Sequence, residues 1–141
     1  MHEDLELSIM SCLLCKPKLM ENIIVEEKHF KKHKGLWKFM NAFYDKFKTF
    51  DISLMYSVCK DKYHIVNYIE LLIDYEPAPS NFMKYQERLI EIYEESEKEV
   101  WIINKIYDLS NLLMIRKINL KEFEEKLKNI YEKAEKIFKE N

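Results

Sequence analysis

The sequence predicts an all-α fold, and three observations support this prediction. Hydrophobic residues recur at spacings of three and four along most of the chain, which is the pattern of a helix with one buried face. The chain has a single glycine, Gly35, and three prolines, whereas all-β folds need many tight turns rich in Gly, Pro, Asn and Asp. With 48% hydrophobic residues among 141, the chain can form a real hydrophobic core.

The first part of the chain reads as a compact bundle of short helices over residues 1–75. Pro17 suits the first turn of a helix, and Asp51 is a good N-cap for a helix with Leu54, Met55 and Val58 inside. Pro77 and Pro79 then break the pattern, because proline cannot lie in a helix interior. The expected elements are helices at residues 5–14, 17–24, 36–47, 52–60 and 63–75, and a turn at 26–34 around a buried Phe30.

The second part, residues 80–141, reads as a long helical hairpin. Ser80 is expected to cap a helix over residues 81–115, whose hydrophobic register shifts at Ser96, which predicts a bend or a local unwinding. Asn119 and Glu122 resemble a capping box. The last helix then carries a heptad seam, at Phe123, Leu127, Ile130, Ala134 and Ile137. The outer apolar face of such a hairpin must pack against the first part or against a partner chain.

Composition excludes several classes of function. The net charge of −2 gives no overall basic excess for nucleic-acid binding. No apolar run approaches the ~20 residues that span a bilayer, and the acidic start of the chain does not resemble a secretory signal. Three cysteines without a framework pattern indicate a reducing, cytoplasmic compartment. Nothing resembles GxxxxGK[ST], so we expect no ATP site, no cofactor and no enzymatic activity.

Two pairs of residues have the spacing of metal ligands, but we interpret both pairs as structural. Cys12 and Cys15 lie within a helix pattern with no second pair at zinc-site spacing, so we expect both to pack in the core. His29 and His33 are surrounded by lysines that would repel a cation. The acidic run on the long helix is expected to form a solvated face or a rim for basic partners; it comprises Glu87, Glu91, Glu94, Glu95, Glu97 and Glu99.

A basic stretch interleaved with aromatic residues leaves one alternative open. Its lysines accompany Phe30 and Trp37, as in some phosphate-contacting patches. A solvated start of a helix is the simpler interpretation. The candidate nucleic-acid contacts are Lys31, Lys32, Lys34 and Lys38, with Lys28 at the edge of the stretch.

The order of motifs resembles the N-terminal domain of DnaB-type replicative helicases. Residues 6–14 are similar to that family's first-helix pattern, E-x-A-V-L-G-S-L-L, although Ser11 stands where glycine is usual. His29, Phe30 and His33, followed by Leu36 and Trp37, resemble its F-Y…H…I-F segment. Tyr44 and 50–51 resemble L-Y…P-I-D, residues 79–81 with Tyr85 and Ile90 resemble P-S-A-A-N-x-x-x-Y…I-V, and residues 134–138 resemble A-E-x-x-I-F. The resemblance stops where the motor domain would begin, as in an excised domain or in a stand-alone relative of the kind that phages and mobile elements encode.

This resemblance implies a scaffold in DNA replication rather than a catalyst. In that family the hairpins pair, and the dimers build a collar that contacts primase and, in some systems, the loader. We therefore expect a homodimer or higher oligomer that binds a replicative helicase, primase or helicase loader, with no membrane partner. The expected self-interaction or partner residues are Leu89, Ile92, Val100, Ile103, Tyr107, Phe123, Leu127, Ile130 and Ile137. The alternative is a nucleic-acid-binding accessory protein that uses residues 28–48.

Overall fold

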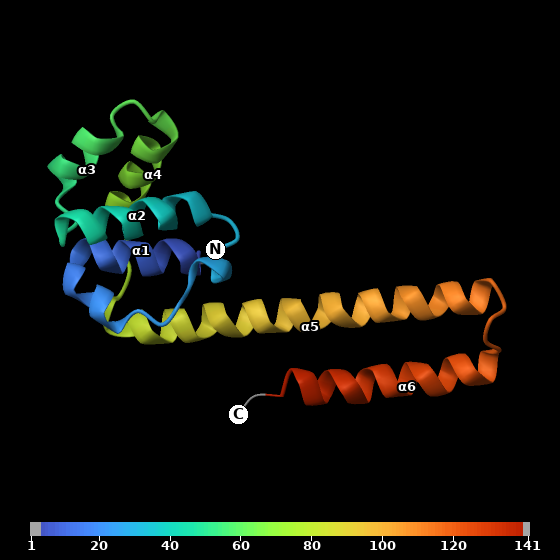
Figure 1. Ribbon diagram of the computed structural model, residues 1–141. Helices are drawn as coiled ribbons and strands as arrows, with labels where there is room; N and C mark the ends of the chain where they lie inside the picture. Colours follow the sequence, from blue (N-terminus) through green and yellow to red (C-terminus); the bar gives the residue numbers. More distant parts are fainter. Residues whose placement is uncertain (1–3, 140–141) are drawn as a thin grey trace. The chain divides into compact units, whose positions relative to one another are not determined.

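The computed structural model describes residues 4–139, and across this range it contains helices and turns but no strand (Figure 1). The predicted all-α fold is confirmed, with short helices followed by a long helix and a final one. The α-helices are α1 (Leu5–Cys15), α2 (Lys34–Phe47), α3 (Ile52–Cys59), α4 (Tyr63–Asp74), α5 (Phe82–Met114) and α6 (Leu120–Ile137). Three short 3-10 helices lie at Pro17–Asn22, Glu27–His29 and Pro79–Asn81. Within this range no helix is both long and apolar enough to cross a membrane.

The chain divides into two units, which we call unit 1, up to Ile90, and unit 2, from Glu91. The first turns of α5 therefore belong to unit 1, and the rest of this 33-residue helix belongs to unit 2. The helix continues through Ser96 without interruption, so the shift in hydrophobic register there does not break the helix. Because α5 contains no proline, every backbone N–H after its first turn can keep its helical partner.

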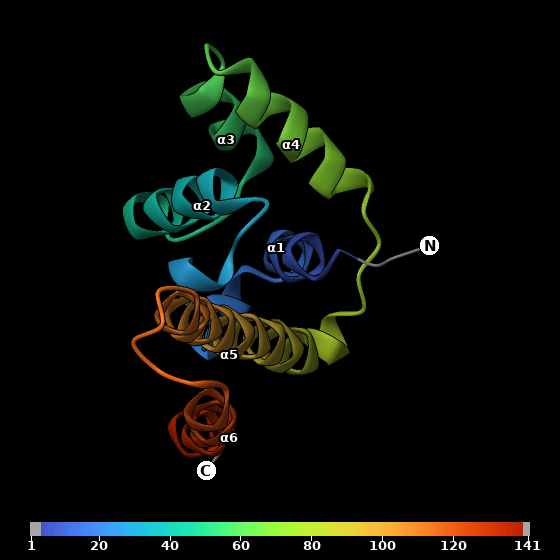
Figure 2. The ribbon, with the colours of Figure 1, turned by 90° about the vertical axis from the view of Figure 1, so that its right-hand side faces the viewer.

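The core of unit 1 is built around α1. Figures 1 and 2 both show α1 lying between α2 and the first turns of α5. This helix is buried nearly all round, and Ile9, Met10 and Leu13 are completely buried. The expected anchor Phe30 is also buried, and its ring stacks on Trp37 with 4.3 Å between ring centroids.

The local signals predicted for the helix starts of unit 1 were correct at Asp51 and Pro17 but not at Ser80. The carboxylate of Asp51 accepts a hydrogen bond of 3.0 Å from the backbone N–H of Leu54, at the start of α3. Ser80 is not at the N-cap position of α5, which begins at Phe82, because it lies inside the short 3-10 helix Pro79–Asn81. Pro17 does open a short helix, which is of the 3-10 kind.

The predicted interior of α3 is partly wrong. Met55 is buried, but Leu54 and Val58 are 40% and 51% exposed. A helix of eight residues that packs through one face buries only positions a turn apart, and here these are Met55 and Cys59. The exposed side chain of Val58 lines an apolar groove between α3 and α2.

Unit 2 is a helical hairpin with its own contacts. The predicted capping box is confirmed: Asn119 Oδ1 accepts from Glu122 N–H at 2.8 Å, and Glu122 Oε1 accepts from Asn119 N–H at 3.3 Å. Lys98 Nζ lies 2.6 Å from Glu135 Oε1, and Trp101 meets Phe138 edge-on. Among residues 91–139, the buried hydrophobic residues are Leu109 and Ala134.

Candidate functional site

An exposed apolar stripe runs along the part of α5 that belongs to unit 2. Val100, Ile103 and Tyr107 are 52%, 63% and 66% exposed. Their spacings of three and four place them on one face of the helix. We call these three residues the α5 stripe. Contiguous apolar surface of this kind is characteristic of protein interaction sites.

The other predicted partner residues divide between exposed and inward-facing positions. Ile92 on α5 and Ile137 on α6 are exposed. Phe123, Leu127 and Ile130 are partly buried. They lead by steps of four and three to the fully buried Ala134, so they share the face of α6 that packs within unit 2.

Leu89, unlike the other predicted partner residues, belongs to unit 1. It lies in the hydrophobic core of unit 1 with Phe82 and Tyr85. Only 7% of its surface is exposed, so it is not available to a partner. Hydrophobic spacing alone does not distinguish this buried turn of α5 from the exposed turns that follow it.

The predicted basic segment is exposed but partly balanced by nearby carboxylates. Lys31, Lys32, Lys34 and Lys38 all lie on the surface. Lys38 Nζ lies 3.9 Å from Glu27 Oε2, and the neighbouring Lys28 lies 3.5 Å from Glu26 Oε2. The predicted acidic run on α5 is likewise exposed along its whole length.

The two histidines of the basic segment have structural partners. His29 is buried, and its Nδ1 accepts a hydrogen bond of 2.8 Å from the backbone N–H of Glu26. His33 Nε2 lies 2.8 Å from Asp4 Oδ2. Within residues 4–139, no group of three or more His, Cys, Asp or Glu side chains is arranged to hold a metal ion.

The structure uses Glu6 in a way that the sequence did not reveal. Glu6 is buried in α1, and its carboxylate accepts hydrogen bonds from three successive backbone N–H groups just before α2. Glu6 Oε2 accepts from Lys31 and Lys32 at 3.3 and 3.2 Å, and Oε1 accepts from His33 at 2.9 Å. Since His33 makes no side-chain cap for α2, Glu6 places negative charge where the helix dipole favours it.

Gln86 is a second buried polar residue whose role the sequence pattern does not reveal. It is completely buried on α5, within unit 1. Its Oε1 accepts from the backbone N–H groups of Ile24 and Val25 at 2.7 and 3.3 Å, and its Nε2 donates to Asn22 O at 3.2 Å. The amide thus satisfies backbone groups at the end of the 3-10 helix Pro17–Asn22 and in the irregular segment that follows it.

The two cysteines of the C-x-x-C spacing differ in burial. Cys12 is buried as expected, but Cys15 is exposed at the end of α1, so its predicted core position is wrong. Burial, and secondarily the proximity of Cys15, raises the pKa of the Cys12 thiol from 9.0 to about 11. Burial also raises the pKa of Cys59.

Because Cys15 is exposed whereas Cys12 and Cys59 are buried, we predict one fast-reacting thiol in the native protein. At pH 8 about one Cys12 side chain in a thousand is a thiolate, and the thiolate is the reactive form. We expect Ellman's reagent to titrate Cys15 rapidly, and Cys12 and Cys59 only after unfolding. The variant Cys15→Ser should then show no fast phase, and a fast phase that persisted in it would contradict this assignment.

Comparison with known protein families identifies the family of this chain. The profile of the DnaB-like helicase N-terminal domain matches residues 1–91. The chain belongs to the DnaB-like helicase N-terminal domain family. The match ends where unit 1 ends, so unit 1 is the DnaB-like part, and the α5 stripe lies beyond it in unit 2. Comparisons with curated proteins and with solved structures found no significant match.

Proposed function

We propose that this DnaB-like domain is a non-enzymatic interaction module of DNA replication. In this proposal its hairpin pairs with a second hairpin of the same type, from another copy of the chain or from a replicative helicase. The module then binds or mimics the helicase collar and so meets a helicase, a primase or a helicase loader. Family membership supports the replication context.

The exposure of the α5 stripe is the observation that carries this proposal. Its three side chains remain in water although unit 2 already buries Leu109 and Ala134 in its own interior. Each large apolar side chain that becomes fully buried contributes roughly 1.5–3 kcal/mol. Pairing through a stripe on one helix face is also how coiled coils associate. Ile92 and Ile137 extend the proposed pairing surface.

The roles of the buried polar groups support a binding rather than a catalytic role. Glu6, His29 and Gln86 all form hydrogen bonds with backbone groups. These hydrogen bonds stabilise the fold, which explains why the three side chains are buried. A catalytic group would instead be positioned beside a substrate cleft with a partner that tunes its pKa.

Replacing a central residue of the stripe tests the pairing. We expect the natural chain to sediment as a dimer or a larger oligomer, and Ile103→Glu to sediment as a monomer at the same concentration, because pairing would bury an unpaired charge. Ser57→Glu adds the same charge at an exposed position of unit 1, away from the stripe, and should leave the mass unchanged. Analytical ultracentrifugation measures all three.

Binding to purified replication proteins tests the rest of the proposal. We expect the helicase, primase or loader of the source cell to bind the natural chain, and a helicase partner to lose binding with Ile103→Glu. A natural chain that is monomeric at about 100 μM, and that binds none of the three proteins, would overturn the proposal. Unwinding assays with the bound helicase then separate activation from inhibition.

A further inference from the structure

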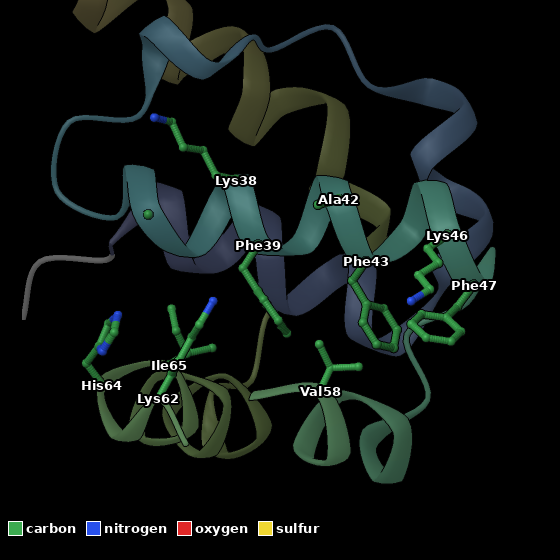
Figure 3. A pocket seen from close by; sticks show the side chains of 11 residues that line it. Lys38, Phe39, Ala42, Phe43, Lys46, Phe47, Val58, Lys62, His64 and Ile65 are labelled. Atoms are coloured by element: carbon green, nitrogen blue, oxygen red, sulfur yellow. The ribbon is translucent and has the colours of Figure 1, made fainter. Parts of the chain in front are cut away.

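Unit 1 carries an apolar groove that has no part in the proposed hairpin pairing. The groove has a volume of about 580 Å³ and lies between α2 on one side and α3 with the start of α4 on the other (Figure 3). All of its lining residues belong to unit 1. The groove therefore shares no residue with the α5 stripe, which belongs to unit 2.

The walls of this groove are hydrophobic from both sides. In Figure 3, Phe39, Phe43 and Phe47 project from α2 toward α3 and α4, and Val58 and Ile65 project back toward α2. Phe43 and Ile65 are buried and form the base, whereas Val58 is half exposed. An apolar wall left open to water favours a ligand that brings its own apolar side chains.

The charged groups of the groove all have the same sign. Lys46 lies at one end with its Nζ 5.3 Å from the centre of the Phe47 ring. Lys62 and His64 lie at the other end, and Lys62 points toward α2. Lys38 lines the groove with its stem only, because its ammonium group points away from α3 and α4 and lies near Glu27. None of the lining residues has a carboxylate.

We propose that this groove binds an acidic, amphipathic helical segment of a partner protein. Apolar side chains on one face of that helix would fill the space between Phe39 and Val58. Its Asp and Glu side chains would meet Lys46 at one end and Lys62 at the other. Helix-in-groove recognition of this kind uses apolar anchors at spacings of three and four, and opposite charges at the rim fix orientation and speed association.

The chemistry of the groove favours this partner over a nucleic acid. Binding of a nucleic acid needs a series of cations that neutralise successive phosphates, and the affinity rises with their number. Here two lysines stand at opposite ends of an apolar surface. Base stacking needs accessible aromatic faces, but Phe43 is buried at the base, and Phe39 and Phe47 are only partly exposed.

A fluorescein-labelled synthetic peptide tests the proposal on the full chain. The peptide carries Leu and Phe on one helix face and Asp and Glu elsewhere, and fluorescence anisotropy measures its binding. We expect saturable binding that weakens at least about tenfold in the double variant Lys46→Glu, Lys62→Glu, because two attractive charges become repulsive. Val58→Glu should weaken binding similarly by placing a charge on the apolar wall.

Matched controls separate this groove from general charge effects. The double variant Lys18→Glu, Lys60→Glu makes the same change in net charge at exposed positions outside the groove, and it should bind as the natural chain does. A peptide with Lys in place of Asp and Glu should bind at least about tenfold more weakly. Circular dichroism spectra confirm that each variant is folded.

Several outcomes would overturn the proposal. One is the absence of saturable binding up to about millimolar peptide. Another is equal affinity for the peptide in the natural chain and in the folded Lys46→Glu, Lys62→Glu variant. A third is that labelled oligothymidylate binds more tightly than the peptide and that the Lys46→Glu, Lys62→Glu variant loses this binding. That result would assign the groove to single-stranded nucleic acid. None of these outcomes depends on whether the hairpins pair.

Discussion

Replacing Glu6 with alanine is expected to lower the free energy of unfolding of unit 1 by about 3 kcal/mol. The reason is that three backbone N–H groups, those of Lys31, Lys32 and His33, lose their acceptor in a part-buried position. Each unsatisfied buried donor costs about 1–3 kcal/mol, and solvent can reach part of this segment. Urea denaturation followed by circular dichroism measures the change.

Two further variants make the role of Glu6 specific. Glu6→Gln keeps the shape of the side chain but loses one acceptor oxygen and the negative charge, so its effect should be intermediate. Glu21→Ala removes an exposed glutamate of the same unit and should change stability by less than about 0.5 kcal/mol. A loss no larger for Glu6→Ala than for Glu21→Ala would show that the three hydrogen bonds do not contribute.

Gln86→Ala is expected to destabilise unit 1 by a similar amount, about 3 kcal/mol. The substitution removes one amide that serves Ile24, Val25 and Asn22, and it leaves a cavity at a fully buried position. Hydrogen exchange gives a second readout, because the backbone amides of Ile24 and Val25 should exchange faster than in the natural chain. Glu87→Ala changes the adjacent exposed residue and serves as the control; equal effects of the two variants would contradict this role.

The elements that could be predicted from the sequence depend on local interactions. The helices of both units follow the three-four spacing, and Asp51 and the pair of Asn119 and Glu122 cap their helices as expected. Such caps join residues three apart in the chain, so a short window contains all the information. The family resemblance was also confirmed over residues 1–91.

The features that could not be predicted depend on residues distant in sequence. Glu6 binds the segment before α2, and Gln86 binds the segment around Ile24, and neither pair has a periodic signature. For the same reason, the spacing did not show that Val58 would be exposed or that Leu89 would be buried. Periodicity identifies a face of a helix, but the tertiary fold decides what that face meets.

The division of α5 between the two units has a consequence for synthesis on the ribosome. Phe82, Tyr85 and Leu89 complete the core that begins with α1, so the start of the chain must wait for residues that emerge much later. The hairpin, by contrast, joins neighbouring helices and closes a short loop. While α2, α3 and α4 are being made, the hydrophobic residues of unit 1 that later contact α5 therefore stay exposed. During that interval they can bind chaperones or associate wrongly with nearby nascent chains.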